Sequence, residues 1–134
     1  MTATDYRGGH QPFAEGPTLD DMTPLFGEDI YEHPEFYLHS GRMERHERES
    51  VRVFLSVRNR PDALVTVYRA LPPDVPQQIN PGDWVALSRA YCEIHAAQSD
   101  NPADDWPIVS RTVPAGEIVT GGSDLIEWGW QPRA

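Results

Sequence analysis

The chain of 134 residues contains no lysine and a single cysteine, Cys92. One cysteine can neither form a disulfide within the chain nor supply a cysteine-rich metal motif, and this favours a reducing, cytoplasmic location. There is also no run of about 18 apolar residues, so no membrane-spanning helix is expected. The first residues are polar and lack the apolar segment of a secretory signal, so we expect no such signal.

Positive charge is scarce as well. Eleven arginines face 21 acidic residues, which gives a net charge of -10. Such a chain repels phosphate backbones on average, which argues against nucleic acid as a partner. The segment 42–60 holds six of the eleven arginines, but Glu44, Glu47 and Glu49 are interleaved with them. This pattern fits either a salt-bridged, solvent-exposed face or a local basic binding patch.

What is present is typical of one globular domain. Hydrophobic residues make up 39% and charged residues 24% of the sequence, and the length is ordinary for a single domain. Residues 1–28 are rich in Gly, Pro, Asp and Thr and predict an irregular N-terminal arm. The folded domain is therefore expected over residues 29–134.

Two helices and several short strands are predicted from periodicity. Apolar residues at three- and four-residue spacing predict a helix over 42–58, with Ser40 as a candidate cap. A second helix is expected over 89–98, capped by Ser88. Between Ile30 and Leu38, an aromatic cluster predicts a loop with one helical turn. Strands are expected at 63–71, 84–87, 108–113, 117–120 and 125–130. Short strands mixed with two helices indicate an α+β fold.

Two of these segments place polar groups where a site could form. Arg69 lies within an apolar strand, where its charge must be paired or face a site; alternatively, it lies at a sheet edge with its head in water. Ser88 stands where a strand runs into a helix, and the free N–H groups there suit an anionic ligand. The simpler interpretation of Ser88 is an ordinary helix cap.

A third segment carries a glutamate among large apolar residues. Glu127 lies between Ile126 and Trp128, and a carboxylate in such surroundings is costly unless it is paired or used. Strand alternation places Glu127 and Trp128 on opposite faces. Glu127 could therefore also point outward while the tryptophan points into the core.

Taken together, the three segments resemble the Arg-Ser-Glu class of the ADP-ribosyltransferase superfamily, in particular small phage-associated domains. The matching runs are Tyr68-Arg69-Ala70, then Gly82-Asp83-Trp84-Val85 with Ser88 and Tyr91, and Glu127-Trp128-Gly129-Trp130. The resemblance covers about residues 25–132. It implies a split antiparallel β-sheet core with a few short helices. It also implies NAD-dependent mono-ADP-ribosyl transfer to a macromolecule, a protein target above all, by a phage or bacterial effector.

The resemblance implies a catalytic set of Arg69, Ser88 and Glu127. Arg69 would hold the NAD⁺ phosphates or adenosine ribose, and Ser88 would orient the nicotinamide ribose and the glutamate. Glu127 would accept a hydrogen bond from the ribose 2′-hydroxyl and stabilise the positive charge that develops as nicotinamide leaves. The residues implied to contact NAD⁺ are Tyr68, Arg69, Trp84, Ser88 and Tyr91, with the Tyr91 ring stacked on the nicotinamide. NAD⁺ is the substrate, and no metal is implied.

One position departs from the family pattern. Many protein-modifying members carry Gln or Glu two residues before the catalytic glutamate, and here that position is Leu125, preceded by Asp124. Asp124 could take over the contact with the acceptor, or the acceptor differs. A catalytically silent acidic binding or inhibitor module, or a phage structural component, on the same fold is the alternative. His95, one turn beyond Tyr91, is a candidate for the core, for support of the site or for catalysis.

Overall fold

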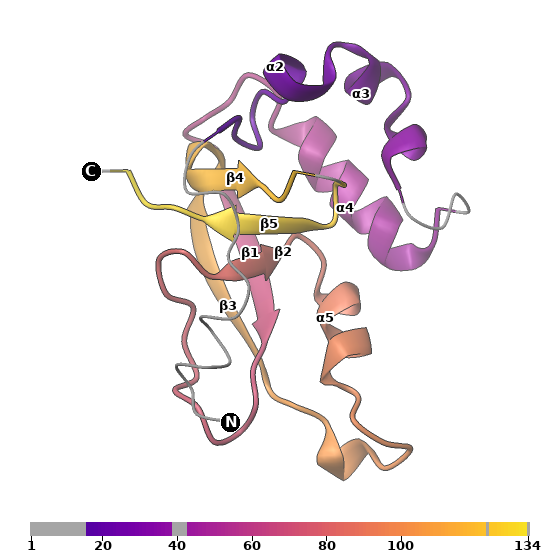
Figure 1. Cartoon of the computed structure of the whole chain (residues 1–134), viewed down its shortest axis with the longest axis vertical. Helices are drawn as coiled ribbons and strands as arrows, with labels where there is room; N and C mark the ends of the chain where they lie inside the picture. The colour runs from indigo at the N-terminus through magenta and orange to yellow at the C-terminus, as the bar shows by residue number, and fades with distance from the viewer. Residues whose placement is uncertain (1–15, 39–42, 123, 134) are drawn as a thin grey trace.

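The computed structural model describes residues 16–38, 43–122 and 124–133 (Figure 1). The helices are α2 (Thr23–Phe26), α3 (Asp29–Glu32), α4 (Arg45–Ser56) and α5 (Arg89–Ala96), with 3₁₀ turns at Pro34–Tyr37, Pro102–Asp104 and Ala115–Glu117. The strands are β1 (Leu64–Ala70), β2 (Trp84–Ala86), β3 (Ile108–Pro114), β4 (Ile118–Thr120) and β5 (Glu127–Trp130). Short helices combined with an antiparallel sheet confirm the α+β prediction.

Within the described ranges, the five strands form one antiparallel sheet in the order β3-β1-β2-β5-β4. The sheet has two parts, the β1–β3 pair and the three strands β2, β5 and β4, and few backbone hydrogen bonds join them. Strands β1 and β3 pair along their whole length, from Leu64↔Pro114 to Ala70↔Ile108, whereas β1 and β2 pair only at Tyr68↔Ala86. The long β1–β3 ribbon therefore runs across the direction of β4 and β5 (Figure 1). This junction between the two parts is where the candidate site lies.

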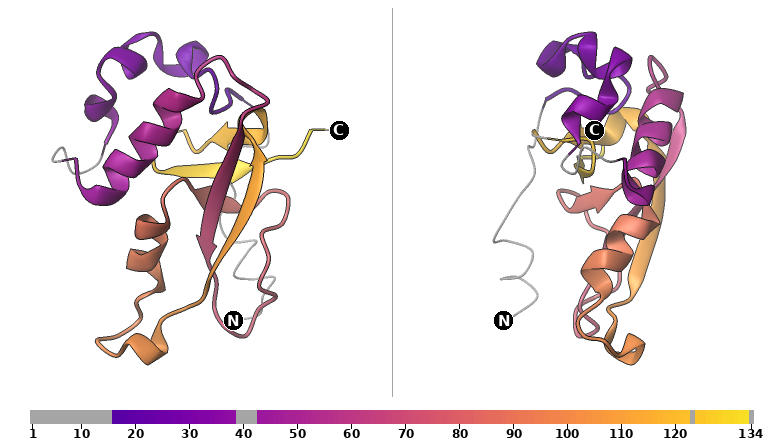
Figure 2. Two further views of the ribbon diagram at one scale, coloured as in Figure 1. Left: turned by 180° about the vertical axis from the view of Figure 1, so that it is seen from behind. Right: turned by 90° about the vertical axis from the view of Figure 1, so that its right-hand side faces the viewer.

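The core fills one side of this junction. Val65 and Val67 of β1 are buried, as strand alternation predicts, and they belong to a cluster that contains Phe54 of α4 and Trp128 of β5. A smaller cluster lies under α5, where Ala70, Ala86, Cys92 and Ala96 are buried together. Helices α4 and α5 lie on the same side of β1 (Figure 2), so both can reach the junction.

Helix α4 begins later than the sequence pattern suggests. Its N-cap is Glu44, which forms a reciprocal capping box with Glu47. This arrangement satisfies two backbone N–H groups that would otherwise lack partners. Ser40, the predicted cap, lies outside the described residues. Glu47 is only 1% exposed, because the capping box holds its carboxylate at the helix start.

Residues 16–28 correct the prediction of an irregular arm. Leu19 and Met22 are fully buried in the core, the Leu19 amide donates a hydrogen bond of 2.8 Å to the Ile118 carbonyl, and Thr18 forms a β-bridge with Val119. This segment therefore packs along β4 as part of the domain. Residues 1–15 lie outside the described ranges. No helix in the described part of the chain has both the length and the apolar character needed to cross a membrane.

Candidate functional site

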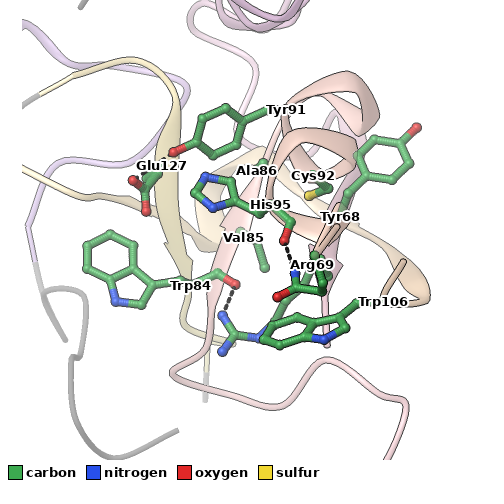
Figure 3. Close-up of a pocket in the computed structure, with 12 residues that line it drawn as sticks. Tyr68, Arg69, Trp84, Val85, Ala86, Tyr91, Cys92, His95, Trp106 and Glu127 are labelled. Carbon is green, nitrogen blue, oxygen red and sulfur yellow. Dashed lines mark hydrogen bonds between the residues drawn. The ribbon is translucent and has the colours of Figure 1, made fainter. Parts of the chain in front are cut away.

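A cavity of about 420 Å³ opens where β1, β2, β5 and α5 meet (Figure 3). Five residues predicted from the sequence line it together: Tyr68, Arg69, Trp84, Tyr91 and Glu127. They come from four elements that are distant in sequence, so their convergence is a result of the fold. Ser88, the remaining predicted residue, does not line the cavity.

Arg69 reaches the cavity from a central strand. Because β1 lies between β3 and β2, the alternative of an arginine at a sheet edge is wrong. Its Nη1 donates a hydrogen bond of 2.8 Å to the backbone carbonyl of Trp84. A guanidinium is planar and carries five N–H donors, so this bond helps to orient the whole group at the cavity wall (Figure 3).

Glu127 is the first residue of β5 and lies opposite Ala86 of β2. Its side chain is half-buried and faces the cavity, whereas the neighbouring Trp128 is buried in the core against Phe54, with ring centroids 6.4 Å apart. Strand alternation thus separates the carboxylate from the tryptophan, as predicted. The Glu127 carboxylate therefore points into the cavity and not into bulk solvent.

The turn before β5 is held by Asp124. One carboxylate oxygen, Oδ1, accepts hydrogen bonds from the amides of Ile126 at 2.7 Å and Glu127 at 3.1 Å. Asp124 is 6% exposed, so it fixes the backbone that presents Glu127 and does not reach out toward an acceptor. Leu125 is fully buried. The burial and the hydrogen bonds of Asp124 argue against a contact between this side chain and an acceptor.

Tyr91 of α5 contacts the catalytic candidate directly. Its hydroxyl donates a hydrogen bond of 3.0 Å to Oε1 of Glu127. Burial, together with the negative charge of Glu127, raises the pKa of Tyr91 far above that of an ordinary tyrosine, so the phenol stays protonated and remains a donor. The Tyr91 hydroxyl is therefore the hydrogen-bond partner of the carboxylate, a contact that the sequence did not predict.

Two histidines lie beside the Tyr91 ring. His95 meets it edge-on, with ring centroids 4.6 Å apart, and His46 of α4 lies at 5.4 Å. His95 is exposed and lines the cavity, so its assignment to the core is wrong. It supports the Tyr91 ring from the solvent side.

Ser88 caps α5 as predicted, with its Oγ accepting from the Tyr91 amide at 3.4 Å. The same hydroxyl donates a short hydrogen bond of 2.5 Å to Oε1 of Glu49 on α4. Ser88 is 2% exposed, and its hydroxyl faces Glu49 and the helix start. This hydrogen bond is the main cause that lowers the pKa of Glu49 below its usual range.

Among the lining residues that the sequence did not single out as parts of a site are Gln98, Trp106 and Cys92. Trp106 follows the loop after α5, and its amide donates 2.8 Å to the Ala96 carbonyl. Only the fold brings it to the same cavity as Arg69, so no local pattern could have revealed it. Cys92 is 5% exposed, as expected of a small buried hydrophobe, and burial raises the pKa of its thiol to about 11.

The described residues that could together hold a metal ion lie away from the cavity. Asp29, Glu32 and His33 bring one potential ligand atom each within 4.8 Å of one another, and all three are exposed. None of them lines the cavity. Exposed carboxylates at the end of a four-residue helix are not evidence of a metal site. The described cavity offers a carboxylate, a phenol, a guanidinium, aromatic rings and a thiol.

Comparisons with protein-family models, with curated proteins and with solved structures find no match to this chain.

Proposed function

We propose that this protein is an NAD-dependent mono-ADP-ribosyltransferase that modifies a protein target. The observation that carries the proposal is the convergence of Arg69, Tyr91 and Glu127 on one cavity. These are three of the residues that the family resemblance assigns to NAD⁺, and 58 positions (127 − 69) separate the first from the last.

The cavity has the chemical features that a dinucleotide requires. A guanidinium binds the anionic pyrophosphate through charge-assisted hydrogen bonds, and Arg69 is oriented for this by the Trp84 carbonyl. Aromatic faces hold flat rings such as nicotinamide, and Tyr68, Trp84 and Tyr91 supply them. Glu127 supplies an acceptor for a ribose hydroxyl.

The proposed reaction breaks the bond between nicotinamide and the ribose. Nicotinamide leaves with the bonding electron pair, and positive charge develops at the anomeric carbon, as in glycoside hydrolysis. The Glu127 carboxylate stabilises this charge, which is largest in the transition state. A nucleophile of the target, or water in its absence, forms the new bond to that carbon and loses its proton.

The narrow junction within the sheet supports an ADP-ribosyltransferase-like split core. A single residue pair joins β1 to β2, and the cavity lies at this junction. The proposal places the protein in a bacterial or host cytoplasm, where NAD⁺ is available, as a phage or bacterial effector.

Nicotinamide release from NAD⁺ by the purified protein tests the proposal, with the products separated by chromatography. We expect slow hydrolysis by the wild type and a loss of about 10²–10³-fold in Glu127→Gln, because the substitution removes a preorganised charge. Glu93→Gln is the matched control, since Glu93 is an exposed α5 carboxylate that pairs with Arg89 at 3.9 Å. Unchanged turnover in a folded Glu127→Gln protein would reject the assignment.

A catalytically silent binding module is the second candidate. The net charge of -10 favours it, as does the fully buried Leu125 at the position where many protein-modifying relatives present a polar side chain. Calorimetry with NAD⁺ separates the two functions. Binding without nicotinamide release would support the silent module, and release would support the enzyme.

A further inference from the structure

We propose that Glu49 of α4 is a positioning residue, which sets the Tyr91–Glu127 pair in place by holding the hydroxyl of Ser88. The catalytic consequence of this inference rests on the proposed function. The structural connection does not.

Three contacts link α4 to the cavity. Oε1 of Glu49 accepts from the Ser88 hydroxyl at 2.5 Å, the Ser88 oxygen accepts from the Tyr91 amide at 3.4 Å, and the Tyr91 phenol donates to Glu127 at 3.0 Å. None of these residues is close to Glu49 in sequence. The path therefore depends on the packing of α4 beside α5.

The direction of the first hydrogen bond is determined by chemistry. An ionised carboxylate can only accept, so the single proton of Ser88 points at Glu49 and its lone pairs are left for the α5 amides. The long contact to the Tyr91 amide thus depends on the position of the hydroxyl. Without Glu49, the hydroxyl could rotate about its Cα–Cβ bond, and the first turn of α5 would lose its fixed cap.

A shift of that turn would reach the carboxylate through Tyr91. The amide and the phenol belong to the same residue, so a displacement of the first turn of α5 moves the phenol relative to Glu127. Hydrogen bonds weaken steeply with distance and misalignment. Helix α4 also places His46 against the Tyr91 ring at 5.4 Å, so the same helix contacts Tyr91 at a second point.

An exposed ion pair alone does not account for Glu49. Its partner Arg45 lies at 3.3 Å in an i,i+4 pair and is largely exposed, and such surface pairs contribute little. Ser88, in contrast, is 2% exposed. A buried hydroxyl that loses its acceptor is costly, so the Ser88 contact is the one that a substitution at Glu49 would affect most.

Three variants of the full chain test the inference: Glu49→Ala, Glu49→Gln and the control Glu93→Gln. The first readout is NMR of the protein without ligand, using the Tyr91 amide and the ring carbons of labelled tyrosine. The second is the separate measurement of kcat and KM for nicotinamide release. Glutamine keeps an oxygen that can accept from Ser88 but has no charge, whereas alanine removes the acceptor.

We expect Glu49→Ala to shift the Tyr91 amide and ring signals and to lower kcat about tenfold, with KM changed less than twofold. In Glu49→Gln, the Tyr91 signals and kcat should both lie close to the wild-type values. Glu93→Gln should resemble the wild type. Unshifted Tyr91 signals in Glu49→Ala would overturn the inference, as would a Glu49→Gln protein as impaired as Glu49→Ala. If the wild type releases no nicotinamide, the proposed function fails, and the NMR comparison alone decides the role of Glu49.

Discussion

The phenol of Tyr91 and the carboxylate of Glu127 point at each other across the cavity and are joined by a hydrogen bond of 3.0 Å (Figure 3). The bond connects α5 to the first residue of β5. It holds one carboxylate oxygen in place. In the proposed reaction the second oxygen faces the ribose, so the geometry of the carboxylate is set before substrate binds.

Substitution of Tyr91 should separate the hydrogen bond from the ring. Tyr91→Phe removes the hydroxyl and keeps the aromatic face, and we expect kcat for nicotinamide release to fall about tenfold with little change in KM. Tyr91→Ala removes both, and we expect KM to rise as well, because the ring surface for nicotinamide is lost. Steady-state kinetics of the two variants provide the measurement. Equal KM values in the two would contradict the stacking role.

Local patterns predicted much of the fold. The helix over α4, the serine cap of α5 and most of the strands follow from periodicity and capping, because these depend on residues close in sequence. The prediction of an irregular arm is wrong for residues 16–28. Its composition is typical of loops, but Leu19 and Met22 insert into the core, and a few apolar residues scattered among Gly, Pro, Asp and Thr are a weak signal.

The site could be predicted only where a chemical type stands out from its surroundings. Arg69 in an apolar strand and Glu127 beside tryptophans are anomalies visible in the sequence, and both line the cavity. The Glu49–Ser88 bond spans 39 positions, and Glu49 looks like one more surface charge among arginines. Contacts of this kind are determined by how α4 and α5 pack, which no local pattern encodes.

Arg69 should be sensitive even to a conservative change. Lysine keeps the charge but lacks the planar fork that can bind the Trp84 carbonyl and a phosphate at once. We expect Arg69→Lys to weaken NAD⁺ binding at least about tenfold in calorimetry, while Arg60→Lys leaves it unchanged. Arg60 is exposed and donates to the Ser56 carbonyl at 3.1 Å, away from the cavity lining. Equal affinities for the two variants would remove Arg69 from the ligand site.

Gly121 is required by a close approach of two backbone segments. A Cβ atom at this position would lie 2.4 Å from the carbonyl oxygen of Glu127 and 2.9 Å from Cζ3 of Trp84. We expect Gly121→Ala to destabilise the protein by about 1–3 kcal/mol in urea unfolding, because the carbonyl cannot move without displacing β5. It should also weaken NAD⁺ binding, since both neighbours belong to the site.

Gly27→Ala is the control for Gly121→Ala. Gly27 has a φ of +74° but nothing within 4 Å of an added Cβ. Alanine there should cost about 1–2 kcal/mol through backbone strain and leave NAD⁺ binding intact. An unaltered affinity in Gly121→Ala would show that the loop after β4 does not support the site.

Cys92 offers a probe of the cavity, because the chain has no other cysteine. Burial raises the pKa of its thiol to about 11. At pH 8 this lowers the reactive thiolate fraction about a hundredfold relative to a thiol with the ordinary value of 9.0. We expect iodoacetamide to modify the native protein very slowly and the urea-unfolded protein completely, as read by intact mass. NAD⁺ should slow the native reaction further, and acceleration by NAD⁺ would contradict its binding in this cavity.

The hydrogen bond from Ser88 to Glu49 should make the free energy of unfolding depend on pH. It lowers the pKa of Glu49 in the folded state below the ordinary value of 4.5, so Glu49 contributes stability above that pH and loses it as the pH falls through its folded-state pKa. Ser88→Ala removes the main cause of this shift. It also removes the helix cap, and the loss of the cap costs about 1 kcal/mol at any pH. The difference in unfolding free energy between wild type and Ser88→Ala should therefore be largest near pH 7 and shrink toward pH 3. Urea unfolding at a series of pH values measures it.

In a Glu49→Gln background the same substitution should cost equal amounts at both ends of the range, because position 49 no longer titrates. A pH-dependent cost that survives in that background would assign the effect to another carboxylate and break the link between Ser88 and Glu49.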